Sequence, residues 1–181
     1  MCPESKKTRF RKKCLQQLQQ ASGYGAYIKD KQVQKELYRL IRETDARSIM
    51  LYLPLKTEVN LYPLIRKLRR EKRRLYVPFM EGASFRLVKY RYPLKRKRFG
   101  FKEPYDSKQY RKKEIDLSIV PIVGTDVTLR RVGFGKGMYD RFFEKEIKNI
   151  KKVVFVARTL CYSEETVTDN FDVQADMIIV S

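Results

Sequence analysis

The chain of 181 residues contains no histidine and no tryptophan, and it has only three cysteines. Without histidine, a Ser-His-Asp triad and every other form of histidine-based acid–base catalysis are excluded. Cys2, Cys14 and Cys161 lie far apart and form no Cys-x-x-Cys pair, so a structural zinc site is not expected. Any chemistry must therefore use carboxylates, lysine, arginine, the backbone or a bound metal ion.

Long apolar runs are also missing, and none is long enough to span a bilayer. The N-terminal region is charged from Glu4 onward and lacks the apolar segment of a signal peptide. We therefore expect a cytoplasmic protein with no membrane partner. The length and the apolar share of 43% predict one domain, residues 1–181, with a substantial core.

Acidic residues are scarce relative to basic ones: 21 Asp and Glu face 41 Lys and Arg, and the net charge is +20. Such a charge attracts anions in general, including nucleic acids, nucleotides, acidic lipid headgroups and polycarboxylates. It does not choose among them. A basic surface that is common to the proteins of the source organism explains the charge equally well.

Helical and strand patterns alternate along the chain. Helices are expected over residues 6–20, 31–43, 61–70 and from 139 onward, and strands over 48–53, 74–78, 84–90, 115–123, 153–157 and 177–180. This alternation predicts an α/β fold, a single three-layer domain with a largely parallel central sheet flanked by helices.

Three glycines alternate around a lysine after the expected strand 115–123; they are Gly133, Gly135 and Gly137 around Lys136. A glycine-rich turn can point several N–H groups in one direction, because no Cβ blocks it. The first N–H groups of the following helix have no partner within the helix and carry the positive end of its dipole. The segment therefore predicts a phosphate site.

Charged residues around the glycines strengthen this interpretation. Arg130 and Arg131 precede the loop, and Asp140 falls in the first turn of the helix, where it could hold a magnesium ion. The pattern is neither a Walker loop nor the dinucleotide fingerprint. A flexible surface turn is the alternative.

The motif Arg131-x-Gly133-x-Gly135-x-Gly137-x-Tyr139-Asp140 resembles the signature loop of the 5-formyltetrahydrofolate cyclo-ligase family, also called methenyltetrahydrofolate synthetases. The resemblance covers nearly the whole chain. Lys7-x-x-x-Arg11 is similar to the lysine–arginine pair that contacts ATP phosphates in that family, although a solvated basic helix face is the alternative.

The resemblance implies a role for each matching residue. ATP would be bound by Lys7, Arg11, Arg131, Gly133, Gly135, Lys136, Gly137 and Asp140, and the folate by Leu53, Glu58, Phe85 and Tyr139. Catalysis would depend on Lys136, Arg131 and Tyr139, and magnesium on Asp140 and Asp172, with Asp176 as the competing choice for the second ligand. The alternative for Glu58 is an exposed glutamate in a loop, which is the more common situation of this residue type.

The implied reaction is the ATP-dependent cyclisation of 5-formyltetrahydrofolate to 5,10-methenyltetrahydrofolate, with ATP and Mg²⁺ as cofactors and a monomeric enzyme. The expected partner is the folate, including its polyglutamylated forms. A basic, non-catalytic RNA-binding protein on the same fold is the main alternative, and a phosphotransferase with another small acceptor is the third. Several positions depart from the family pattern, including the segment 121–126 in place of Pro-Gly-x-x-Phe-Asp. In two further departures, Met138 replaces a tyrosine and Leu129 replaces a glycine.

Overall fold

A six-stranded sheet forms the centre of the computed structural model, which describes residues 4–97, 100, 102–105 and 114–181. The strand order is β11 (Met177–Val180), β9 (Val153–Ala157), β6 (Leu117–Pro121), β1 (Ser48–Met50), β2 (Arg74–Glu81) and β3 (Ser84–Lys89). The first five strands are parallel, and β3 pairs with β2 in the antiparallel direction. The predicted α/β class with a largely parallel sheet is confirmed.

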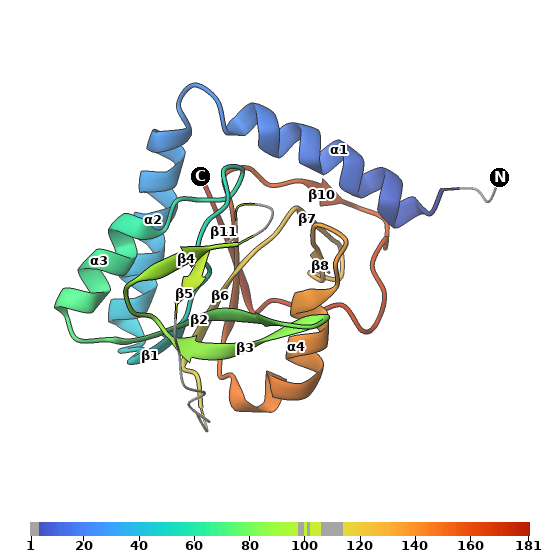
Figure 1. Cartoon of the computed structure of the whole chain (residues 1–181). Coiled ribbons are helices and arrows are strands. Elements are labelled where there is room, and N and C mark those ends of the chain that lie inside the picture. Colours follow the sequence, from blue (N-terminus) through green and yellow to red (C-terminus); the bar gives the residue numbers. More distant parts are fainter. Residues whose placement is uncertain (1–3, 98–99, 101, 106–113) are drawn as a thin grey trace.

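Helices cover both faces of this sheet (Figure 1). On one face, α2 (Ala26–Glu43) and α3 (Tyr62–Arg70) pack in a core cluster with strand residues such as Ile49 and Val154. On the other, α1 (Lys6–Ala21) and α4 (Met138–Glu146) pack with Met50 and Phe155. Because successive strand residues point to opposite faces, neighbours in one strand serve the two cores.

Two of the strands are shorter than the apolar runs from which they were predicted. The run 48–53 contributes only Ser48–Met50 to the sheet, since the next three residues stay buried but turn into the loop beyond β1. The run 115–123 contributes Leu117–Pro121. By contrast, β9 and β11 match the predicted ranges.

The second helix begins at Ala26, five residues before the predicted start at 31. Tyr27 and Ile28 in its first turn are 73% and 62% exposed, so their apolar side chains obscure the inward-facing periodicity. Gly25, with φ of 82°, precedes the helix in the left-handed region that favours glycine. The start therefore depends on backbone geometry rather than on the apolar pattern.

Among the described residues, five short strands beyond the main sheet were not predicted, and three of them lie together. β10 (Tyr162–Ser163), β7 (Gly124–Asp126) and β8 (Arg131–Val132) form a small sheet in the order β10-β7-β8. Since β8 runs directly into the glycine loop, this small sheet supports the predicted phosphate site. Elsewhere, β4 (Leu94–Arg96) pairs with β5 (Lys102–Pro104), and the 3-10 helix η2 (Ile147–Asn149) follows α4.

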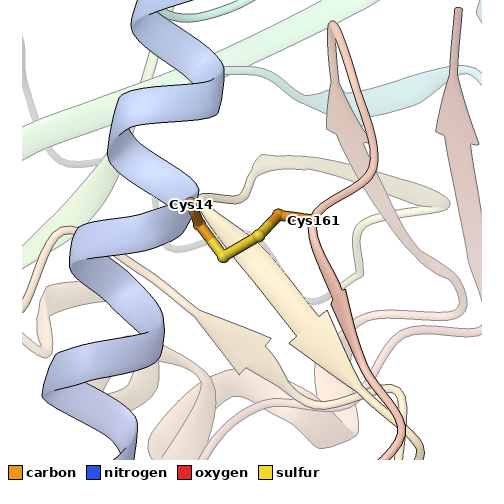
Figure 2. Close-up of a disulfide and its surroundings, with 2 residues drawn as sticks. All are labelled: Cys14 and Cys161. Atoms are coloured by element: carbon orange, nitrogen blue, oxygen red, sulfur yellow. A yellow bond between two sulfur atoms is a disulfide. The ribbon is translucent and has the colours of Figure 1, made fainter.

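A disulfide between Cys14 and Cys161 ties α1 to the segment just before β10 (Figure 2). The two residues are 147 positions apart, and their Cα atoms are 5.4 Å apart. The sequence analysis did not predict this bond, because spacing alone does not show which distant cysteines meet in the fold.

Within the described part of the chain, every helix is too short or too polar to cross a membrane.

Candidate active site

A pocket lies where β1 and β2 end and the glycine loop begins, and it encloses about 90 Å³. In parallel sheets, this carboxyl edge of the strands is the usual place for ligands. Its lining includes Tyr52, Leu53, Leu55, Glu58, Pro78, Met80, Phe85, Lys102, Arg131, Phe134, Lys136, Gly137, Met138 and Tyr139. The structure therefore brings the predicted folate residues and the core of the glycine loop into one cavity.

Two of the three glycines in the loop adopt the left-handed backbone that favours glycine. Gly135 and Gly137 have φ of 93° and 60°, and Gly137 directly precedes α4. Arg11 Nε donates a hydrogen bond of 2.9 Å to Gly133 O, and Arg141 Nη2 donates to Lys136 O. Both contacts use carbonyl oxygens of the loop, and neither engages one of its N–H groups.

Gly133 makes room for the buried guanidinium of Arg131. A Cβ at this position would lie 2.2 Å from Arg131 Nη1, which is too close for any contact. Arg131 is only 5% exposed, and its Nε donates to Pro121 O at 3.0 Å. The arginine therefore has little freedom to move aside. Only a residue without a Cβ at position 133 lets the backbone lie this close to the guanidinium group.

Arg131, Tyr139 and Phe85 form one stacked group in the pocket. The Arg131 guanidinium lies 4.5 Å from the centroid of the Tyr139 ring, and the Phe85 ring meets that ring edge-on at 5.0 Å. Burial lowers the pKa of Arg131, while the charge of Asp140 opposes this shift. Burial also raises the pKa of Tyr139, with a contribution from Glu58. Tyr139 thus presents a neutral hydroxyl to the pocket.

Glu58 lies in the pocket rather than on an exposed loop. Its Oε2 accepts a 2.7 Å hydrogen bond from Leu55 N–H. Burial raises the pKa of Glu58 to about 7, and the Leu55 hydrogen bond and the charge of Arg131 oppose this shift. Near neutral pH, Glu58 therefore exchanges between a carboxylate and a neutral acid, and a ligand that donates hydrogen bonds favours the carboxylate.

Lys7 and Arg11 project from α1 toward the loop region, but they reach different groups. Lys7 Nζ contacts Asp172 and lies 2.9 Å from Asp169 Oδ2. Burial lowers the pKa of Lys7, and the hydrogen bonds to the two aspartates outweigh it, so the net shift is upward. The pair is therefore not a freely solvated basic face.

The three aspartates considered as metal ligands occupy different places. Asp140 Oδ1 accepts a long hydrogen bond of 3.4 Å from the N–H of Val173, the residue after Asp172. Asp172 is 5% exposed and pairs with Lys7. Asp176 instead accepts from Val153 N–H at 2.7 Å, which joins β9 to the start of β11. Asp140 and Asp172 thus border the same short segment, whereas Asp176 supports the sheet.

A family model described as the 5-formyltetrahydrofolate cyclo-ligase family matches residues 3–181. The chain belongs to this cyclo-ligase family. The 5-formyltetrahydrofolate cyclo-ligase of Haemophilus influenzae is 28% identical over 162 residues, which cover 83% of this chain and 84% of that protein. The corresponding protein of Mycoplasma genitalium is 25% identical over 155 residues, which cover 85% and 84%.

Solved structures agree with this membership. The NMR structure of the Aquifex aeolicus 5,10-methenyltetrahydrofolate synthetase has a TM-score of 0.77 and 29% identity, and the match covers 96% of this chain and 89% of that chain. A 5,10-methenyltetrahydrofolate synthetase from Mycoplasma pneumoniae has a TM-score of 0.74 at 24% identity, covering 96% and 98%. The second match bears on the fold alone.

Two of the departures from the cyclo-ligase pattern have structural consequences. Leu129 has φ of 56°, the left-handed backbone that favours glycine, so the turn keeps a glycine-like shape with a side chain that resists it. Its amide donates to Asp126 O at 2.8 Å, which closes the turn. Met138 begins α4 and lines the pocket with its thioether side chain.

Sequence reasoning missed one buried charged pair that supports the cyclo-ligase pocket. Arg158, directly after β9, makes two hydrogen bonds to Asp30, at 2.7 and 3.1 Å, and both residues are buried. Arg158 Nη1 also donates to Lys56 O at 3.0 Å, which holds the loop that carries Glu58. The sequence did contain one signal for this pair, since Arg158 directly follows the wholly apolar run 153–157.

Tyr52 and Arg141 were missed as well. The Tyr52 hydroxyl donates to Val59 O at 3.0 Å, beside Glu58. Arg141 bridges the glycine loop to Ala83 O in the β2–β3 turn, at 2.8 Å from Nε. The sequence shows neither contact, because Tyr52 meets Val59 through the bend of one loop and Arg141 reaches Ala83 from α4.

Proposed function

We propose that the chain catalyses the ATP-dependent cyclisation of 5-formyltetrahydrofolate to 5,10-methenyltetrahydrofolate, with release of ADP and phosphate. One observation carries the proposal: Glu58, Arg131, Lys136 and Tyr139 line a single pocket that opens beside the glycine loop. The two curated relatives named above are 5-formyltetrahydrofolate cyclo-ligases, which supports the same activity.

In this proposal, the glycine loop and its neighbouring cations bind the phosphates of ATP. The amides around Gly133, Gly135 and Gly137 supply fixed dipoles, and Lys136 is exposed at the rim, where it can reach a terminal phosphate. Arg11 borders the loop through Gly133 O. Lys7 joins this group when a phosphate competes with Asp169 and Asp172 for its ammonium group.

The folate occupies the apolar part of the pocket. Leu53, Phe85 and Tyr139 provide flat apolar surface, and Glu58 accepts hydrogen bonds from the N–H groups of the pterin ring. Because Glu58 is desolvated, a bidentate hydrogen bond to its carboxylate is stronger here than it is in water. Glu58 therefore fixes the orientation of the pterin ring. The guanidinium group of Arg131 packs against the Tyr139 ring and holds it in place.

The reaction then follows from positioning and charge neutralisation. The formyl oxygen attacks the γ-phosphorus, the bond to ADP breaks, and a phosphorylated imidate forms. The nitrogen at folate position 10 attacks the activated carbon, and phosphate leaves with the formyl oxygen. Lys136 and Arg131 offset the negative charge that spreads over the transferring phosphoryl group. No step requires histidine, which agrees with the composition.

Magnesium fits this donor set when nucleotide supplies the remaining ligands. The described residues contain no cluster of three or more acidic, cysteine or histidine side chains suited to a metal ion. Mg²⁺ commonly takes one or two protein carboxylates together with phosphate oxygens and water. Asp140 would hold it, and Asp172 would do so once Lys7 turns to phosphate. When bound, the ion neutralises phosphate charge.

The test is a direct assay for methenyl-folate by its absorbance, with protein, ATP, magnesium and 5-formyltetrahydrofolate mixed. We expect turnover in the unchanged chain and at least a hundredfold loss in Asp140→Ala, roughly the effect of removing one electrostatic stabiliser. Glu144→Ala, an exposed residue of the same helix, is the matched control. Absence of turnover in the unchanged, folded chain would refute the proposal.

The partner and location are part of the same proposal. Lys102 and Lys136 at the pocket, within a chain of +20 charge, favour folates that carry anionic glutamate tails. Affinities for mono- and polyglutamate forms that are equal and insensitive to salt would contradict this preference. We also propose a monomeric protein in the cytoplasm, where folate chemistry takes place. A non-catalytic RNA-binding role is not favoured.

A further inference from the structure

The disulfide lies on the same face of α1 as the two cations of the proposed ATP site. Lys7, Arg11 and Cys14 are spaced by four and three residues, so they follow one another along one side of the helix. The Sγ atom of Cys14 is therefore bonded to Cys161 one turn from Arg11 and about two turns from Lys7.

At its other end, the disulfide attaches to the small sheet that supports the glycine loop. Cys161 O accepts a 3.0 Å hydrogen bond from Thr125 N–H in β7. Thr125 is in turn the partner of Arg131 across the β7–β8 pair, and Arg131 leads into Gly133. The bond thus connects the helix with Lys7 and Arg11 to the strands that present Arg131 and the loop (Figure 2).

The contact between the helix and this sheet is closely packed. A Cβ at Gly124 would lie 2.8 Å from Cys14 Sγ, 2.9 Å from Cys161 O and 3.0 Å from the Phe10 ring. Two separate thiols need more room than a disulfide, because non-bonded sulfur atoms cannot approach to bonding distance. Because there is no room even for a Cβ at Gly124, we infer that reduction of the bond moves α1 outward.

Besides the disulfide, α1 is held by the buried Leu18 and by the partly buried Phe10 and Leu15. Its polar contacts toward the loop region come from Lys6, Lys7 and Arg11. A small displacement of the helix therefore moves both cations relative to the glycine loop. No residue of α1 lines the folate pocket, so we expect the affinity for folate to be preserved.

We propose that the Cys14–Cys161 disulfide positions the phosphate-binding arm of α1, so that the redox state of this pair sets the affinity for ATP and leaves folate affinity unchanged. The proposal rests on the proposed function in assigning Lys7 and Arg11 to ATP. Cys14 and Cys161 act through these two cations and are positioning residues.

The redox step is ordinary thiol–disulfide exchange. A thiolate of a dithiol reductant attacks one sulfur, the Cys14–Cys161 bond breaks, and a mixed disulfide forms. The second thiol of the reductant resolves it, so the protein gains two electrons and two protons and the reductant becomes a disulfide. The reverse step needs a low-molecular-weight disulfide, such as oxidised glutathione, as the electron acceptor.

The experiment uses the full chain with Cys2→Ser, so that only the two pairing cysteines are counted by thiol labelling. It is prepared oxidised with oxidised glutathione and reduced with a dithiol, and labelling confirms each state. We expect reduction to raise the KM for ATP about fivefold to tenfold, the effect of losing part of one charged contact, with an unchanged KM for 5-formyltetrahydrofolate. The same chain carrying Cys14→Ser should match the reduced form and not respond to reductant.

Direct ATP affinity without folate, and amide hydrogen exchange of α1, are measured on the same samples. They report on the helix even if no turnover with formyl-folate is seen, which separates failure of this proposal from failure of the proposed function. Equal ATP affinity and equal exchange in the two labelled states would overturn it. So would a pair that stays reduced in oxidised glutathione.

Discussion

Glu58 is buried in the pocket, and this burial disfavours its charged form and raises its pKa. With a pKa of about 7, the carboxylate that we propose for binding the pterin forms only as the pH rises toward neutrality. The same residue therefore links the substrate affinity and the stability of the empty pocket, and the two effects have opposite signs.

For activity, we expect kcat/KM for 5-formyltetrahydrofolate to rise as the pH increases through about 7. Glu58→Gln should lose this rise and fall about tenfold or more at neutral pH, since the amide keeps an acceptor for Leu55 N–H but carries no charge. The measurement is a pH–rate profile of both forms. Glu81→Gln, an exposed residue at the β2–β3 turn, serves as the control. An identical profile in Glu58→Gln would exclude the proposed role.

For stability, the sign is reversed. The pKa of Glu58 is raised from 4.5 to about 7, so the folded chain binds more protons than the unfolded chain between these values. Stability is thus lost as the pH rises through this window, and Glu58→Gln should increase the free energy of unfolding by about 1 to 3 kcal/mol at roughly pH 8. Below about pH 4 the two chains should agree. Urea unfolding at both pH values measures the difference.

Gly133 is constrained by space, because a side chain at this position would collide with Arg131. The glycine gives the Arg131 guanidinium its space, so Gly133→Ala should displace the arginine from Tyr139 and lower kcat/KM by about a hundredfold. Gly23→Ala is the control, because a Cβ there meets nothing closer than 3.4 Å. Full activity in Gly133→Ala, with a folded chain by circular dichroism, would contradict this account.

Among the helices and strands, the buried pair of Asp30 and Arg158 joins α2 to the end of β9 and to the loop that carries Glu58. Its two hydrogen bonds compensate charges that would otherwise be costly inside the protein. Their mutual attraction adds little net stability, but removing one partner leaves the other charge buried alone.

Arg158→Met should therefore lower the free energy of unfolding by about 3 to 5 kcal/mol, whereas adding Asp30→Leu should recover most of that loss. The double variant still lacks the hydrogen bond to Lys56 O, so we expect a raised KM for the folate in a stable protein. Urea unfolding and steady-state kinetics test the two effects separately. A double variant as unstable as Arg158→Met alone would refute the buried-charge explanation.

Secondary structure followed the sequence where one physical signal dominated. The apolar run of β9 gave its limits because a central parallel strand covered on both faces is apolar throughout. The apolar run of β11 gave its limits as well, although this edge strand is only partly buried. The β7–β8–β10 sheet had no such signal, since its strands are two or three residues long and include polar side chains. The start of α2 was predicted late because apolar residues of its first turn face solvent.

For the whole molecule, the Cys14–Cys161 bond closes the chain across 147 residues. Reducing it should lower the free energy of unfolding by about 2 to 5 kcal/mol, because the unfolded chain regains the freedom that the cross-link removes. Urea unfolding of the oxidised and reduced Cys2→Ser chain measures the change. A difference below about 1 kcal/mol would show that the unfolded state gains little from release.

The sequence by itself determined the fold class and the position of the glycine loop. These follow from local physics: apolar periodicity, the conformational freedom of alternating glycines, and the start of a helix directly after them. The resemblance of the motif and its flanking segments indicated the family and grouped Glu58 with Arg131 and Tyr139, which line one pocket, but it did not show that Glu58 is desolvated.

Only the tertiary structure decided which distant groups meet. The pairing of Cys14 with Cys161, of Lys7 with Asp172, and of Arg158 with Asp30 joins residues separated by more than a hundred positions. No local sequence pattern predicts these pairs, because each contact depends on how the helices and loops pack against the sheet. Burial then sets the charge state of Glu58, since desolvation exists only after the surrounding walls have assembled.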